Sequence, residues 1–269
     1  TRVDPNGVYY WDTLGDLCWD LGLRGLGGFA YGESVTLLPD PRRHLFLAPA
    51  DRLPDLGEIA VRALQRALGP PRNADAESVY RNLGTLLLRL DRFAEARRAF
   101  EKAEEASEAG NYISFQAYAA SRQGLDEEAV RLYRKALARD RLEDGGRFRN
   151  HLRLGQLLEK TGRHAEAARE LQVALGIRPG DLRALLLLGQ IDEALGLVDE
   201  AEEHYVKAAE TSEEPITALV NLVEFYRRVG RPAEALVPAR RLVELQPEDD
   251  VYRRLIQQLG AEMDSRRAR

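Results

Sequence analysis

The chain has 269 residues, of which 31% are charged and 44% hydrophobic, and its formal net charge is −5. General nucleic-acid binding is usually the work of a basic domain, so this charge balance argues against it. No apolar run approaches the length of about 18 residues that a membrane span needs, and no signal-peptide pattern is present, so the sequence assigns no compartment.

Helix-forming residues dominate the composition. Ala, Leu, Arg and Glu favour helices, whereas tracts of Val, Ile and Thr that would favour strands are missing, so we expect an all-α chain. The first expected helix pair covers residues 8–40. The second, at residues 41–76, is irregular because Pro49 and Pro54 should break its first helix.

Two further helix pairs are expected at residues 77–109 and 110–147. In the first of them, Asp91 stands where other copies carry a glycine between the helices. The polar stretch from Arg141 to Gly146 lengthens the second of these pairs, and we expect that stretch to form a loop.

A constant repeat period is clearest in the second half of the chain, where three more pairs are expected at residues 148–181, 182–215 and 216–249. In the first of these pairs the recurring positions hold Leu154, Gly155, Gly162, Ala167, Leu171, Ala174 and Pro179. We expect Gly155 and Gly189 to let paired helices approach closely. We expect Gly162, Gly196 and Gly230 to end the first helix of each pair in left-handed geometry.

This pattern resembles the tetratricopeptide repeat family over nearly the whole chain. The resemblance implies one right-handed superhelical solenoid of antiparallel helix pairs over residues 1–269, with about seven repeats. The last helix, expected at 250–263, has a polar face that suits a solvating cap, and we expect the tail from Asp264 to fray. Pro5 lies one repeat period before Pro39, so we also expect a further repeat upstream and a longer parent protein.

Motifs that would indicate catalysis are missing from the sequence. It has no Walker-type phosphate loop, no GxSxG elbow and no HExxH, so we expect no enzymatic activity and no cofactor. The glycine-rich residues 22–32 follow a helical pattern, which favours a loose helix turn over a phosphate cradle. We also expect no metal site, because no two of the four histidines stand at ligand spacing with a carboxylate: His44, His151, His164 and His204.

A binding groove is the remaining candidate site. In the family that the chain resembles, the first helix of each repeat lines the concave surface that holds peptide partners. Carried across, those positions give an acidic strip in the first repeat: Tyr9, Asp12, Asp16 and Asp20. From the third repeat onward they give a groove rich in arginine and amides. Its candidate partner-binding residues are Arg81, Asn82, Arg89, Phe115, Tyr118, Arg122, Arg149, Arg153, Gln156, Arg183, Gln190 and Asn221.

Such a groove suits an extended acidic peptide or a free C-terminal carboxylate, because guanidinium groups bind carboxylates at two points. Chaperone-binding members of the family hold such a carboxylate in a clamp of basic and asparagine side chains. Here Arg81, Arg149 and Arg153 stand at the basic positions, but Thr85 and Phe115 occupy the asparagine positions. We therefore expect a groove that is electrostatically similar to the clamp without being one.

Three interpretations of function stay open at this point. The leading one is a protein–protein interaction scaffold, which the high ratio of arginine to lysine would place in a bacterium with a GC-rich genome. The second is an accessory segment of a larger enzyme or of a membrane or secretion assembly, and the third is a self-association module. For each groove arginine, simple solvation and pairing with a glutamate on an adjacent helix is the competing explanation.

Overall fold

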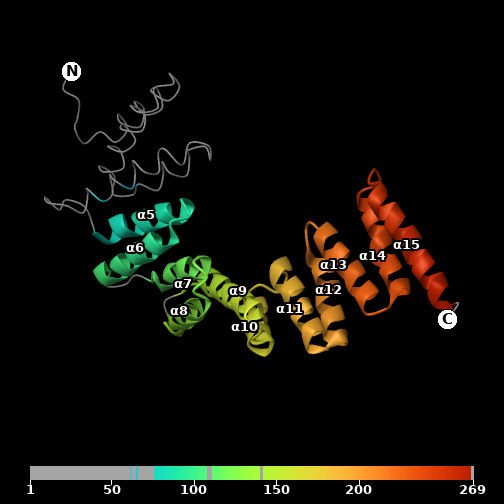
Figure 1. Cartoon of the computed structure of the whole chain (residues 1–269), viewed down its shortest axis with the longest axis horizontal. Helices are drawn as coiled ribbons and strands as arrows, with labels where there is room; N and C mark the ends of the chain where they lie inside the picture. The colour runs from blue at the N-terminus through green and yellow to red at the C-terminus, as the bar shows by residue number, and fades with distance from the viewer. Residues whose placement is uncertain (1–60, 62–64, 66–75, 108–110, 140–141, 268–269) are drawn as a thin grey trace, which may run out of the picture. The chain divides into compact units, whose positions relative to one another are not determined.

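The computed structural model describes Val61, Gln65 and residues 76–107, 111–139 and 142–267. The first predicted helix pair, nearly all of the irregular second pair and the acidic strip lie outside this part. Within it every regular element is a helix, labelled α5 to α15 in Figure 1, which confirms the all-α prediction. The chain divides into two compact units, residues 1–141 and 142–269, and each is described by itself.

Four described helices belong to the first unit, and each packs on the next along the chain. They are α5 (Ala76–Arg89), α6 (Phe93–Ala106), α7 (Ile113–Arg122) and α8 (Asp126–Ala138). Alanines at helical spacing let the paired helices come close. Ala96 and Ala103 of α6 and Ala129 and Ala136 of α8 are completely buried.

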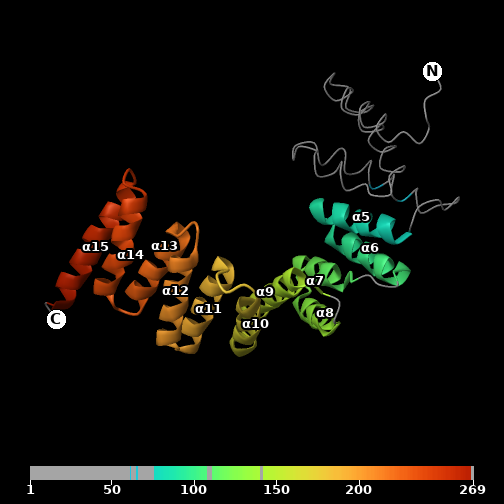
Figure 2. The same cartoon turned by 180° about the vertical axis from the view of Figure 1, so that it is seen from behind.

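The second unit has the same arrangement of consecutive antiparallel pairs, followed by one more helix (Figure 2). Its helices are α9 (Asp144–Lys160), α10 (His164–Ile177), α11 (Leu182–Leu195), α12 (Val198–Thr211), α13 (Ile216–Arg228), α14 (Pro232–Leu245) and α15 (Asp250–Arg267). The first helices of successive pairs also contact one another, because α11 touches both α9 and α13. These first helices therefore lie next to each other along the unit.

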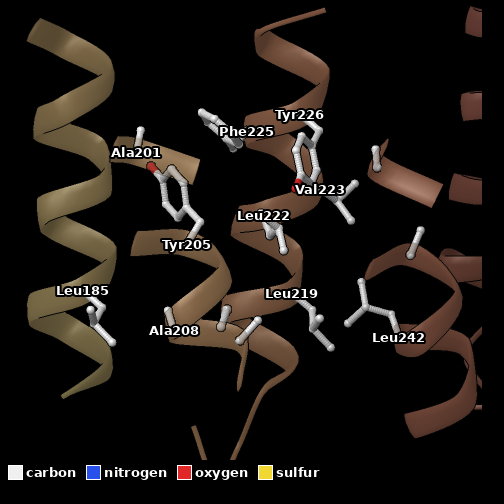
Figure 3. Close-up of a cluster of buried hydrophobic side chains, with 14 of the residues drawn as sticks. Leu185, Ala201, Tyr205, Ala208, Leu219, Leu222, Val223, Phe225, Tyr226 and Leu242 are labelled. Atoms are coloured by element: carbon white, nitrogen blue, oxygen red, sulfur yellow. The ribbon is translucent and has the colours of Figure 1, made fainter. Parts of the chain in front are cut away.

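The core of the second unit runs through successive helix pairs. Figure 3 shows side chains of α11, α12, α13 and α14 meeting in one buried cluster. Tyr205 of α12 and Phe225 of α13 are fully buried, and their ring centroids are 5.1 Å apart. Leu259 of α15 is buried in the same cluster, so α15 extends this core.

Glycines allow the close approach within helix pairs, as the sequence predicts for Gly155 and Gly189. A Cβ on Gly155 would lie 2.7 Å from Cγ of Leu171, and one on Gly189 would lie 3.0 Å from the ring of Tyr205. These distances are shorter than ordinary van der Waals contact, so a side chain at Gly155 would force Leu171 to move and one at Gly189 would press on the Tyr205 ring.

Residues in left-handed conformation connect the helices of each described pair. The predicted glycines Gly162, Gly196 and Gly230 have φ values of 75°, 76° and 79°, which confirms that prediction. Asp91 takes the same role in the α5–α6 turn with a φ of 56°. Aspartate tolerates this geometry better than most residues, so the turn survives without a glycine.

Two expectations about helix ends are wrong. Asp144, Gly145 and Gly146 form the first turn of α9 instead of a loop, and the acidic side chain of Asp144 suits a helix N-terminus. The C-terminal helix does not fray at Asp264 but continues to Arg267. There Nη1 of Arg266 donates a hydrogen bond to the Gly230 carbonyl at 2.5 Å, which satisfies an acceptor beyond the end of α13.

Candidate functional site

One face of α9 carries a row of long polar side chains. Arg149, Arg153, Gln156 and Lys160 recur at intervals of one helical turn, so they share a stripe along the helix. Arg149, Gln156 and Lys160 are exposed, and Arg153 is partly buried. This stripe is the most basic surface that the structure gives to any first helix of the second unit.

The same stripe continues on α11 and α13, one and two repeat periods further along the chain. On α11 it consists of Arg183, Leu187, Gln190 and Ala194, and on α13 of Thr217, Asn221, Glu224 and Arg228. We call these positions on the neighbouring first helices the binding face. Its predicted members Arg183 and Gln190 are exposed, whereas Asn221 donates its amide to the Thr217 carbonyl of its own helix at 2.8 Å.

The charges on α13 are already paired within the protein. Nε and Nη2 of Arg228 donate to both carboxylate oxygens of Glu193 on α11, at 3.0 and 2.7 Å. The hydroxyl of Tyr205 donates to the same carboxylate at 2.7 Å. Burial and this hydrogen bond raise the pKa of Tyr205 above its usual range, so the phenol stays protonated. Arg228 and Glu193 thus form a link between adjacent first helices.

A second link joins α13 to α15. Arg227 donates to Glu224 at 3.0 Å and to Glu262 at 2.7 Å. This contact was not predicted from the sequence, although the spacing of the two charged residues along the chain could have indicated it. The separation of Arg227 from Glu262 equals that of Glu193 from Arg228, so opposite charges about one repeat apart mark side chains that meet between neighbouring helices.

Arg149 of α9 and Arg183 of α11 differ from these paired residues. Neither makes a hydrogen bond or an ion pair with any residue in the described ranges, and both are exposed. They occupy equivalent positions on neighbouring helices. Two exposed guanidinium groups in this arrangement can each bind a carboxylate at two points.

In the first unit the predicted basic residues are more constrained. Arg81 donates to Ser78 at 3.2 Å and lies close enough to Tyr112 to influence its pKa, which burial raises to about 12. Asn82 was predicted to face a partner, but its side chain is only 2% exposed, so this prediction is wrong for the described conformation. Arg89 is partly buried.

The two predicted aromatic anchors lie on α7. Phe115 is 45% exposed and stacks on Phe100 with a centroid distance of 5.0 Å. Tyr118 is partly buried, and its hydroxyl accepts a hydrogen bond from Arg122 at 3.0 Å. The guanidinium of Arg122 also lies 4.5 Å from the ring centroid of Phe93. Arg122 is therefore engaged with its own unit.

Two histidine–carboxylate pairs each join the helices of one pair. Nδ1 of His151 lies 2.7 Å from Glu170, and Nδ1 of His204 lies 2.8 Å from Oδ2 of Asp192, although the second pair is not aligned for a hydrogen bond. Burial raises the pKa of Asp192, while His204 opposes that rise. Within the described ranges no three His, Cys, Asp or Glu side chains group as metal ligands. We interpret both pairs as structural.

A shallow pocket in the first unit has a mostly apolar floor. It is lined by Gln65, Tyr80, Leu83, Leu87, Glu95, Arg98, Ala99 and Lys102. Two of its charged side chains already have partners, because Glu95 pairs with Arg92 and Lys102 with Glu105. We assign it no ligand.

Comparisons with known proteins give the same repeat along the chain. One tetratricopeptide repeat profile matches residues 116–181 and 152–215, and a second matches residues 78–102. No curated protein matches the sequence. None of the helices in the described part of the chain has both the length and the apolar character that a membrane-spanning helix needs.

Solved structures of repeat proteins share the fold. MamA (residues 41 to the end) from Desulfovibrio magneticus RS-1 is 22% identical with a TM-score of 0.58, covering 66% of this chain and 98% of that one. YrrB, a protein described as having an unusual peptide-binding site, is 20% identical with a TM-score of 0.54. The match covers 71% of this chain and 96% of YrrB. The apo form of RapI is 13% identical with a TM-score of 0.63, and the match covers 90% of this chain and 75% of RapI.

Proposed function

This chain belongs to the tetratricopeptide repeat family, whose members bind protein or peptide partners, and we propose that its second unit binds an acidic segment of a partner protein on the binding face. The observation that carries the proposal is the contrast along this face. Arg149 and Arg183 are exposed and have no partner among the described residues, whereas Arg228 is tied to Glu193. The segment's carboxylates would therefore bind over α9 and α11.

The neighbouring side chains support an extended segment. Gln156 and Gln190 are exposed at equivalent positions of α9 and α11, and an amide offers both a donor and an acceptor to a peptide backbone. YrrB, which shares the fold, is described as having a peptide-binding site. A backbone held by amides and side-chain carboxylates held by arginines would together orient the segment across the helices.

The proposal is tested with a fluorescein-labelled acidic peptide and a charge-reversal variant. Arg149→Glu/Arg183→Glu should weaken binding about 30-fold, since two charge-assisted contacts of about 1 kcal/mol each are lost. Affinity of the wild type should also fall as salt rises, because exposed charges are screened. Fluorescence anisotropy measures both effects.

The matched control is Arg240→Glu/Arg241→Glu. These two arginines are exposed on α14, a second helix of the same unit, and the change in net charge is the same. The control should bind the peptide nearly as well as the wild type. Equal loss in both variants would mean that only overall charge matters and would refute a site on the binding face.

A further inference from the structure

The C-terminal helix α15 occupies the position that a first helix would have in an eighth repeat. It packs on α14, buries Leu259 in the core of the unit and is joined to α13 by the Arg227–Glu262 ion pair. Its residues also follow the period, because Val251 and Leu255 lie one repeat after Thr217 and Asn221. α15 thus presents the same stripe as α9, α11 and α13.

One row of this surface changes in character from α9 to α15. The equivalent positions hold Arg149, Arg183, Thr217 and Val251, which makes the row basic on α9 and α11 and apolar on α15. Val251 is 54% exposed, and Val220, which precedes the binding-face residue Asn221 on neighbouring α13, is 36% exposed. Next to Val251, the carboxylate of Asp250 is already paired with Arg253 at 2.6 Å.

We infer that α15 extends the binding face of α9, α11 and α13 by a fourth helix. We also infer that the bound segment is acidic at one end and aliphatic at the other. This inference rests on the proposed function, because it extends the same site. The charge complementarity at Arg149 and Arg183 sets the acidic end, and the exposed valines set the aliphatic end. A polar cap alone would not need an exposed valine at this position of the row.

The spacing of the helices sets the register of the segment. Packed helices lie about 8–10 Å apart, and an extended chain rises about 3.3 Å per residue, so one helix step corresponds to about three residues. The segment should then carry acidic residues at its first and fourth positions, a small residue at the seventh and an aliphatic residue at the tenth. The geometry does not distinguish the two chain directions, so both are included in the test.

Three labelled peptides with Gly and Ser at the remaining positions test the inference, each made in both directions. The first has Asp at positions 1 and 4 and Leu at 10, the second has Ser in place of that Leu, and the third has Asp at 1 and 2 and Leu at 10. The wild type should bind the first peptide about tenfold more tightly than the second, because a leucine side chain is removed from water. It should bind the third more weakly than the first.

Val251→Asp should remove the advantage of the leucine peptide and leave binding of the second peptide within about twofold. The matched control is Val237→Asp, since Val237 is 75% exposed on α14 and receives the same change. This control should keep the advantage. Circular dichroism confirms that both variants are folded.

The outcomes separate the two proposals. Equal binding of the first and second peptides would overturn the role of α15, and equal binding of the first and third would overturn the register of the segment. The proposed function stands in both cases. Absence of binding to every acidic peptide, in both directions, would overturn the proposed function and this inference with it.

Discussion

Gly155→Ala tests the packing of the helix pairs most sharply. The new Cβ would lie 2.7 Å from Cγ of Leu171 and 2.9 Å from its Cδ2, and Leu171 is fully buried. Overpacking of this kind costs about 1–3 kcal/mol, and the better helix propensity of alanine offsets about 1 kcal/mol of it. We therefore expect Gly155→Ala to lower the free energy of unfolding by about 1 kcal/mol.

Gly260→Ala is the matched control. Gly260 also lies inside a helix, α15, but a Cβ there would meet nothing within 4 Å, so the same change should stabilise the protein by about 0.5–1 kcal/mol. Thermal unfolding followed by circular dichroism should separate the two variants by roughly 3–8 °C. If Gly155→Ala raises the melting temperature as much as Gly260→Ala does, the close packing at Gly155 is not as described.

Three other predictions concern hydrogen bonds and backbone strain. Burial and the hydrogen bond to Glu202 raise the pKa of Tyr226 to about 12. The stability that depends on the neutral phenol therefore persists to about pH 10 and is lost as the pH rises to 12. Tyr226→Phe should reduce this loss, which thermal unfolding measured between about pH 10 and 12 would show. Arg227→Ala breaks the link to Glu262, and amide exchange in α15 should accelerate about three- to tenfold by mass spectrometry; unchanged exchange would deny the link a role. Asp91→Gly relieves a φ of 56° and should raise the urea midpoint by the equivalent of about 0.5–1 kcal/mol, whereas a lower midpoint would show that the aspartate side chain stabilises the turn.

The sequence predicted the fold because the repeat depends on local requirements. Close packing at Gly155 and Gly189 and a left-handed turn at Gly162 each restrict the residue type, so the same types recur at these positions in most of the described repeats. Asp91 shows the limit of this reasoning. The left-handed turn is kept at Asp91 although the residue is not a glycine. Only the position of Asp91 within the repeat period, and not its residue type, predicts this turn.

The binding face was harder to predict, because exposure and pairing depend on contacts between helices. Arg183 and Arg228 have the same residue type on neighbouring first helices, but only Arg228 has Glu193 within reach. Asn82 fits the pattern of a partner-facing position and is buried. The role proposed here for α15 was not part of the sequence-based prediction, because its many polar residues suggested a solvating cap. The exposed Val251 gains meaning only beside the equivalent positions of the earlier helices.

Affinity capture of partners from a lysate of the source organism, followed by mass spectrometry, tests the central claim most directly. Wild-type protein, Arg149→Glu/Arg183→Glu and Arg240→Glu/Arg241→Glu would be used side by side at the same salt concentration. We predict a protein with an acidic segment that is captured by the wild type and by the α14 control and is lost with the α9–α11 variant. Capture of the same protein by all three would contradict an acidic partner site on the binding face.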